Sequence, residues 1–579
     1  VRQLAGLGLG GPVAGMLLLH AGVAPAQSAA SANKATRRGG GGLLKLLWWQ
    51  GPTQLNPHFA TGTKDQDGAR LFYEPLADWD ADGNLVPILA AELPTLANGA
   101  VARDGRSVVW KLKQGVLWHD GRPCTADDLV FTWEYARNPD TAAVSAGFFN
   151  PVQVQKIDSH SVRIVFKDPT PFWAGAFVGA GGNVLPRHLF APYIGARSRD
   201  APVNLKPVGT GPYRFVEFKP GDMLRGELNP NYHVPNRPFF DSIEMKGGGD
   251  AVSAARAVIQ TGEYDFAWNL QIEDDVLKRM ESGGKGRAVY AAGGDVEYMQ
   301  FNFADPNTEV DGERSNPKTR HPLLGDPAVR QALALLLDRA NIQAFIYGRA
   351  GKATANFINN PARFVSPNNR WEFSVDKANA VLEAAGWRRA AGNAGAADGV
   401  RSKGGKPLKL LFQTSTNALR QKTQALVKQA AAKAGIEVEI KAVAGSVFFS
   451  TDLGNPDTYG KFYADIQMFT TSGTIDPERL MLRFASWEIA SKANKWSGLN
   501  LNRWRNDDYD ATYRAAKVEL DPVKRAALFI RMNDLVIQNH AVVPVAHRQT
   551  VAAVANKLVA PLSGWANDTW LLHEWFREA

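Results

Sequence analysis

The chain has 579 residues, a length that predicts two or three domains. Hydrophobic residues make up 45% of it and charged residues 21%, a composition that excludes wholesale disorder. Its formal net charge is +9, but the Lys and Arg residues are scattered along the sequence, which argues against a nucleic-acid-binding surface. Cys124 is the only cysteine, so no intrachain disulfide can form.

Residues 1–26 have the pattern of a secretory signal peptide. Arg2 supplies a short positive start, an apolar run covers 13–19, and small residues at 24–26 provide a cleavage site. The run is too short and interrupted to span a membrane, and a buried helix is the alternative interpretation. We therefore expect an exported chain in which residues 27–42, rich in Ala, Ser and Gly, form a flexible linker.

The segment 107–137 predicts a strand, a tight turn and a helix in succession. Apolar and polar residues alternate from Val108 to Lys113, as in a strand with one buried face. Gly121 suits a turn because it can adopt positive φ, and Thr125 suits the N-cap of the helix that follows.

Periodicity and turn residues predict the other elements in the same way. The expected strands cover 43–50, 162–166, 213–218, 408–412, 436–443 and 542–545, and the expected helices cover 251–260, 329–337, 418–434 and 521–540. The segment 408–443 therefore predicts a β-α-β unit, whereas 388–406, rich in Gly, Ala and basic residues, predicts an exposed hairpin or loop.

The segment 107–137 closely resembles the signature of the family 5 extracellular solute-binding proteins, which are the receptors of ABC transporters. Three other segments are similar to landmarks of this family and occur in its order: Phe72–Leu76, Pro207–Phe215 and Asp326–Leu333. The resemblance extends from Leu43 to the C-terminus. It implies an α/β chain with the two-lobed periplasmic-binding-protein fold, of the type II, cluster C-like kind, with three domains and a hinge.

The resemblance also implies how the chain is divided. Domain I would comprise 43–80, 206–305 and 546–579, domain II would comprise 81–205, and domain III would comprise 306–545. The chain would then cross between the lobes twice, which makes a hinge that can close over a ligand.

The function implied is that of a periplasmic receptor rather than an enzyme. It would capture a small solute, with a peptide as the leading candidate, in the cleft between the lobes and deliver it to an inner-membrane ABC permease with its ATPase subunits. We expect a monomer without cofactor or metal, without membrane insertion and without nucleic acid. Because Cys124 lies far from the cleavage point, we do not expect a lipoprotein.

The strand end at 467–478 departs from the pattern of peptide-binding relatives. Those relatives often carry a Trp and, three residues later, an Asp that binds the ligand's α-ammonium, just before an acid-Pro pair. Aligned on Asp476-Pro477, these positions hold Thr470 and Gly473 here. A buried ammonium needs a carboxylate, so either Asp476 takes this role or the ligand lacks a free amino terminus. Asp476 is equally well explained as a turn residue or helix cap.

Further candidates for ligand contact follow from position in the resemblance. They are Thr61 and Thr63, Phe148 and Phe149, Thr471 and Ser472 beside Thr470, and Trp496 and Trp504. An aromatic residue among them is more often part of a hydrophobic core than of a binding site.

Two patterns suggest catalysis but have simpler explanations. His119 next to Asp120 suits proton transfer or zinc, yet both fit a turn; Ser315 and Lys318 have nucleophile-base spacing, yet Pro317 favours a loop. A hydrolase of peptides or cell-wall fragments that uses Ser315 or His119 is therefore one alternative function. An oligosaccharide or opine receptor is another, favoured if aromatic faces dominate the cleft and no carboxylate anchors the ligand.

Overall fold

The computed structural model describes residues 37–60, 62–389, 399–449, 454–496 and 498–578. The expected signal peptide at 1–26, most of the expected linker and the candidate Thr61 lie outside the described residues.

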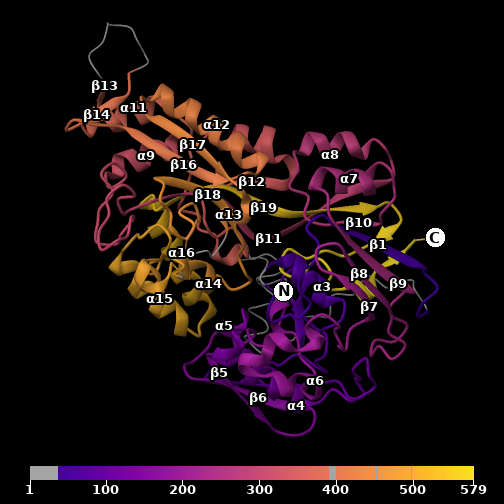
Figure 1. Cartoon of the computed structure of the whole chain (residues 1–579). Coiled ribbons are helices and arrows are strands. Elements are labelled where there is room, and N and C mark those ends of the chain that lie inside the picture. Colours follow the sequence, from indigo (N-terminus) through magenta and orange to yellow (C-terminus); the bar gives the residue numbers. More distant parts are fainter. Residues whose placement is uncertain (1–36, 61, 390–398, 450–453, 497, 579) are drawn as a thin grey trace.

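A mixed sheet of eleven strands forms the centre of the described chain (Figure 1). Its order is β17-β16-β18-β11-β19-β10-β1-β9-β8-β7, with β12 beside β19. The strands are β1 (Leu43–Trp48), β7 (Tyr213–Lys219), β8 (Met223–Leu228), β9 (Ser242–Gly247), β10 (Phe266–Ala267), β11 (Gly286–Phe301), β12 (Gly351–Ala353), β16 (Lys409–Ser415), β17 (Glu437–Val443), β18 (Ile466–Thr471) and β19 (Val542–Ala555). The predicted strands at 43–50, 213–218, 408–412 and 436–443 are confirmed, and the one at 542–545 is the start of the longer β19.

The two halves of this sheet belong to two lobes with separate hydrophobic cores. In the first lobe, α7 (Ala251–Ile259) and α8 (Asp274–Glu281) pack against β1 and β10. In the second lobe, α9 (Pro327–Leu335), α11 (Val375–Ala384) and α12 (Ala418–Lys433) cover one face of β16–β18, and α14 (Glu478–Met481), α15 (Asp507–Val518) and α16 (Pro522–Gln538) lie together on the other side (Figure 1). The parallel pair β16 and β17, joined by α12, confirms the predicted β-α-β unit.

The long strands β11 and β19 run through both lobes as an antiparallel pair. Their register shifts between Ala292 and Val296, where three residues of β11 oppose the single Arg548 of β19. Two of the three are glycines, and a Cβ at Gly293 would lie only 2.0 Å from the carbonyl oxygen of Gly564. A bulge of this kind locally interrupts the ladder and bends the strand, so it marks the point at which the two lobes join.

A small sheet completes the first lobe and contains the strand, turn and helix predicted at 107–137. Its order is β4 (Ser107–Lys111), β6 (Ser161–Phe166) and β5 (Val152–Lys156), all antiparallel, and α4 (Ala126–Arg137) packs beside it. The Thr125 side chain caps α4, and Asp128 completes a capping box. Gly121 has a φ of 86°, as the turn requires.

Three of the family-like segments meet at one buried contact. His119 accepts a hydrogen bond from the Gly209 amide (3.1 Å) and donates one to the Gly211 carbonyl (3.0 Å). Gly209 lies so close to Phe72 that a Cβ would be 1.8 Å from the Phe72 carbonyl oxygen. The next side chain, Thr210, donates to the buried Glu74 carboxylate at 2.9 Å. These landmarks therefore hold the first lobe together.

The remaining regular elements are short. They are α3 (Thr63–Arg70), β2 (Ala77–Trp79), β3 (Leu85–Pro87), α5 (Ala146–Phe149), α6 (Arg187–Phe190), α10 (Arg339–Ile342), β13 (Arg388–Arg389), β14 (Arg401–Lys403), β15 (Lys406–Pro407), α13 (Gly445–Phe448), β20 (Leu558–Val559) and β21 (Phe576–Arg577). The antiparallel strands β13–β15 occupy the described part of the predicted hairpin at 388–406.

Candidate functional site

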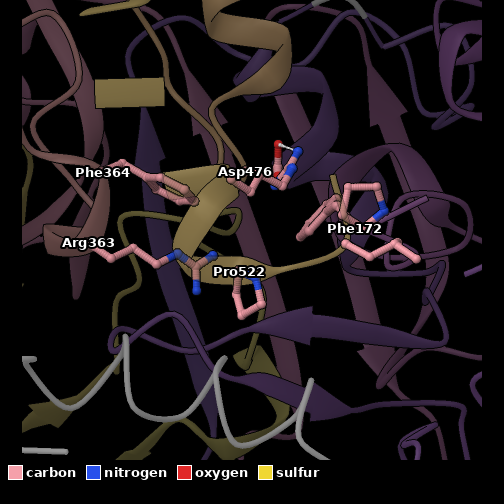
Figure 2. Close-up of a pocket in the computed structure, with 8 residues that line it drawn as sticks. Phe172, Arg363, Phe364, Asp476 and Pro522 are labelled. Carbon is pink, nitrogen blue, oxygen red and sulfur yellow. Dashed lines mark hydrogen bonds and ion pairs between the residues drawn. The ribbon is translucent and has the colours of Figure 1, made fainter. Parts of the chain in front are cut away.

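A small pocket, part of it open to solvent and with a cavity volume of about 20 Å³, lies between the two lobes. The first lobe contributes Pro171 and Phe172, and the second lobe contributes Arg363, Phe364, Asp476, Leu520, Pro522 and Arg525. Figure 2 shows Arg363 and Phe172 approaching the pocket from opposite sides. The pocket is thus built from segments that are brought together only by the way the lobes meet.

The first-lobe wall of the pocket is apolar. Phe172 follows β6 and stacks on Trp79 of β2, with ring centroids 5.8 Å apart and an interplanar angle of 17°. Pro171 beside it has no backbone N–H to donate. This wall offers area to a ligand without offering it hydrogen bonds.

On the second-lobe wall, Asp476 and Arg525 form a buried ion pair. Both carboxylate oxygens of Asp476 accept from the Arg525 guanidinium, one at 2.9 Å, and Asp476 also accepts from the Glu478 amide at 3.0 Å. Arg525 sits in the first turns of α16, where its Nε donates to the Ala516 carbonyl at 2.9 Å. Asp476 therefore acts at the start of α14, and its carboxylate is already occupied by a cation.

Arg363 occupies the same wall without such a partner. Its guanidinium lies over the Phe364 ring at 4.4 Å, and it forms no hydrogen bond or ion pair with any described residue. Burial lowers the pKa of Arg363 to about 10; the attraction of the Asp476 carboxylate opposes this shift, and the repulsion of Arg525 adds to it. The guanidinium stays charged at neutral pH, so the pocket holds a cation whose N–H groups have no hydrogen-bonding partner among the described residues.

The strand end of β18 belongs to a buried ionic network. The Thr470 hydroxyl donates to Glu297 and accepts from Arg420 (3.0 Å) and Arg548 (2.9 Å). Burial acts to raise the pKa of Glu297, but Arg420 and Arg548 outweigh it and hold this pKa below its ordinary value. Thr470 is thereby engaged within the protein, at the strand bulge where the lobes join.

The residues after Thr470 differ in their surroundings. Thr471 is buried, whereas Ser472 is exposed and hydrogen-bonds the carboxylate of Asp295 in the β11 bulge. Burial raises the pKa of Asp295, although Arg548 and Ser472 oppose this shift. A Cβ at Gly473 would lie 2.7 Å from the Gly294 carbonyl oxygen, so this strand end has no room for a side chain there.

The other predicted site residues fall in three environments. Phe148 faces the second lobe, with the Arg479 guanidinium 5.4 Å from its ring centroid. Phe149 and Trp504 are buried core residues, and Thr63 is exposed at the start of α3. Trp496 is half-buried beside Lys461, 4.9 Å from its ring, and its indole nitrogen has no hydrogen-bond partner among the described residues. Of all the predicted residues, Asp476 lines the interlobe pocket and Phe148 lies at the contact between the lobes.

Sequence reasoning missed Arg363, Arg525, Phe172 and Asp295. The Asp521-Pro522 pair does predict the start of α16, but no local pattern tells which residue Arg525 faces. Phe172 lies in a loop and Arg363 in a three-residue 3-10 helix, and in neither does periodicity carry information.

The groups suggested for catalysis are engaged in the fold. Both ring nitrogens of His119 are hydrogen-bonded to backbone, and burial lowers the pKa of His119 to about 4. The buried Ser315 hydroxyl donates to the Phe462 carbonyl at 2.8 Å, whereas Lys318 pairs with Asp311 on the surface. Ser315 and Lys318 therefore have different partners and do not form a nucleophile-base pair.

The described part of the chain contains neither a membrane-spanning helix nor a cluster of metal-binding side chains. There, no helix combines the length and apolar character that crossing a bilayer requires. No three His, Cys, Asp or Glu side chains of those residues gather in a group that could hold a metal ion.

Comparison with known proteins places this geometry in context. A family model described as "Bacterial extracellular solute-binding proteins, family 5 Middle" matches residues 84–491. The oligopeptide-binding protein AppA of Bacillus subtilis (strain 168) is 26% identical over 475 residues, which cover 80% of this chain and 79% of that protein. The glutathione-binding protein GsiB of Pectobacterium atrosepticum is 26% identical over 393 residues, covering 68% and 67%.

Solved structures confirm the predicted two-lobed α/β fold. NikZ from Campylobacter jejuni in complex with Ni(L-His) matches with a TM-score of 0.74 at 21% identity, covering 92% of this chain and 99% of that chain. AppA from Bacillus subtilis in complex with a nonapeptide matches with a TM-score of 0.71 at 23% identity, covering 94% and 100%.

Proposed function

Because the chain belongs to family 5 of the bacterial extracellular solute-binding proteins, we propose that it is a periplasmic receptor that captures a small solute between its lobes, with a peptide as the leading candidate, and delivers it to an inner-membrane ABC permease with its ATPase subunits. Members of this family bind solutes for transport, which confirms the prediction that the chain is not an enzyme. The rest of the proposal goes beyond membership of the family.

The observation that carries the proposal is the position of the pocket between the lobes. Its walls come from both lobes, so relative movement of the lobes would open or close it. Ile475 of the second lobe packs into the hydrophobic cluster of the small sheet, and Arg479 lies over Phe148. These contacts between the lobes would stabilise a closed state, and the β11 bulge is a point at which the chain could bend during closure.

The peptide assignment rests on the relatives and on the strand end. The matched proteins include ones named for oligopeptide and glutathione binding, but NikZ carries Ni(L-His) on the same fold. Asp476 is paired with Arg525, and Gly473 leaves no room for an acid, so a solute with a free ammonium would need another carboxylate. Asp295, beside Ser472, is the carboxylate that this strand end offers.

An oligosaccharide or opine receptor is the second candidate. The stacked Phe172 and Trp79 provide the aromatic wall that such a ligand requires, and the pairing of Asp476 removes one expected ammonium anchor. The proposal also includes the three-domain division and a monomer.

Mass spectrometry of solutes released by denaturation from natively purified protein tests the assignment. We expect a heterogeneous set of short peptides, and we expect Phe172→Ala to retain less of it per mole of folded protein because a pocket wall is lost. Phe345→Ala, at a side chain that is 72% exposed, is the matched control. Recovery of only sugars or amine-free compounds, with no thermal shift from any peptide library, would contradict the peptide assignment.

A further inference from the structure

The charges that line the interlobe pocket do not balance. Two guanidinium groups, Arg363 and Arg525, face a single carboxylate, Asp476, and the other lining residues carry no charge. Arg525 and Asp476 neutralise one another through two hydrogen bonds. One positive charge therefore remains in the pocket, and it belongs to Arg363.

This charge makes no hydrogen bond or ion pair within the described fold, although Asp476 attracts it. A partly desolvated guanidinium without a hydrogen-bonding partner is unfavourable, and arginines away from water are normally paired. Burial lowers the pKa of Arg363 to about 10, and the repulsion of Arg525 acts in the same direction, against the attraction of Asp476. A group that costs stability in the empty protein has a rationale if a bound molecule supplies its partner.

The surroundings of Arg363 also favour a planar anion. The Phe364 ring lies against the guanidinium at 4.4 Å and occupies one of its faces, while the N–H donors at its edge stay available. Figure 2 shows the Arg363 side chain extending toward Pro522, with Phe172 on the far side of the pocket. The apolar Pro171 and Phe172 would shield the charge when the pocket is filled, and a carboxylate matches the fork of donors in two hydrogen bonds.

A second arginine at the lobe contact has the same character. Arg479 lies over the Phe148 ring and forms no hydrogen bond or ion pair with any described residue. The second lobe thus presents two uncompensated cations toward the first lobe. Such a surface attracts anionic solutes before the pocket closes.

We propose that Arg363 binds a carboxylate of the solute in the interlobe pocket and thereby makes this receptor selective for acidic ligands. The inference rests on the proposed solute-binding function and adds the chemical class of the ligand to it. It assigns to Asp476 a supporting role, because this residue holds Arg525 and leaves Arg363 as the cation that faces the solute.

The test uses the solute mixture released from wild-type protein, before and after methyl esterification, which converts carboxylic acids to neutral esters. Thermal shift is measured for the wild type, Arg363→Gln, Arg363→Lys and Arg256→Gln. Arg256 is exposed on α7 and forms no hydrogen bond or ion pair through its side chain with described residues, so R256Q is the matched control for loss of one positive charge. Ligand-free R363Q should melt no lower than the wild type, which separates loss of binding from loss of folding.

We expect the untreated mixture to stabilise the wild type and R256Q, and the esterified mixture to bind at least about tenfold more weakly, as loss of charge-assisted hydrogen bonds implies. R363Q should lose this discrimination, and R363K should recover part of it. If esterification changes nothing, or if R363Q still prefers the acids, the assignment of Arg363 is wrong while solute binding stands. If the wild type releases no solute and shows no shift, the proposed function itself fails and the inference falls with it.

Discussion

Arg363 and Arg525 are chemically identical side chains in one pocket, yet they have opposite relations to the fold. Arg525 makes an ion pair with Asp476 and a backbone hydrogen bond to Ala516, so removing it would leave buried groups unpaired. Arg363 has neither contact, so its removal leaves no described group without a partner. At the scale of the residue, burial and pairing distinguish structural from binding groups where residue type does not.

Asp476→Asn should destabilise the protein strongly. The change leaves the buried Arg525 guanidinium without its anion, and breaking such a pair typically costs about 3–5 kcal/mol of unfolding free energy. Urea denaturation checks this value. Asp508→Asn, which weakens an exposed contact with Arg531, is the matched control and should cost under about 1 kcal/mol. Equal effects of the two changes would contradict the structural role of Asp476.

His58 predicts a loss of stability in mild acid. It is fully buried, with Nδ1 2.6 Å from the Ser145 hydroxyl and Nε2 3.0 Å from the Asn183 carbonyl, and burial lowers the pKa of His58 to about 4 from an ordinary 6.5. Between these pH values the imidazole binds a proton more tightly in the unfolded chain than in the folded one. The contribution of the neutral His58 ring to the unfolding free energy is therefore complete above pH 6.5 and is lost as the pH falls toward 4. From pH 7.5 to pH 4.5 we expect a loss of roughly 2–3 kcal/mol at 1.36 kcal/mol per pKa unit.

Urea denaturation of the wild type and His58→Gln at the two pH values measures this contribution as a difference. The variant should be less stable at pH 7.5, but it should lose less stability than the wild type on acidification. Parallel pH profiles would show that the His58 ring does not resist protonation in the fold.

At the scale of the element, local sequence signals were sufficient to find several of the helices and strands, but not all of them. Thr125 caps α4, Asp521 and Pro522 begin α16, and Gly435, with a φ of 75°, follows α12, each as its residue type predicts. Local sequence signals could not predict which distant elements pair, because β11 and β19 are separated by about 250 residues and the length of each strand depends on its pairing with the other. The pocket shares this limit, since its walls combine segments near residues 171, 363, 476 and 525.

The packing of the 207–212 turn against residue 72 gives a test at this scale. Gly209→Ala would place a Cβ 1.8 Å from the Phe72 carbonyl oxygen, so we expect it to abolish soluble folded protein or to lower the melting temperature drastically. Gly121→Ala is the matched control, because its φ of 86° carries a strain of about 1–2 kcal/mol while its surroundings are open. Circular dichroism melts distinguish the two, and a mild effect of G209A would contradict the close contact.

At the scale of the whole molecule, the fold identifies the class of protein, whereas our proposal assigns its specificity to the lobe contact. The segments that resemble the family pack in the interior of the first lobe, where they contact one another through His119, Gly209 and Glu74. The departures from the family pattern lie at Thr470 and Gly473, where the lobes join. Sequence resemblance could therefore predict the architecture, but the charge of the pocket required three-dimensional contacts.

Movement of the lobes can be tested by linking them. In a Phe148→Cys, Arg479→Cys double variant, a flexible bismaleimide should join the two thiols across the lobe contact, and the buried Cys124 should not react. Protein linked after its solute has been removed should no longer take up solute, and protein linked beforehand should retain it. The unlinked double variant is the control; solute exchange at the same rate in linked and unlinked protein would show that uptake does not require opening.

The position of β19 has a consequence for how the protein is made. This strand pairs with β10 on one side and with β11 on the other. Within the described chain it therefore joins the two halves of the main sheet. It is formed by residues 542–555, which are synthesised after every other strand of the main sheet. Neither half can acquire its central neighbour before then, and a chain terminated early would expose two unpaired strand edges, a known template for aggregation. Completion of the main sheet therefore awaits the synthesis of β19.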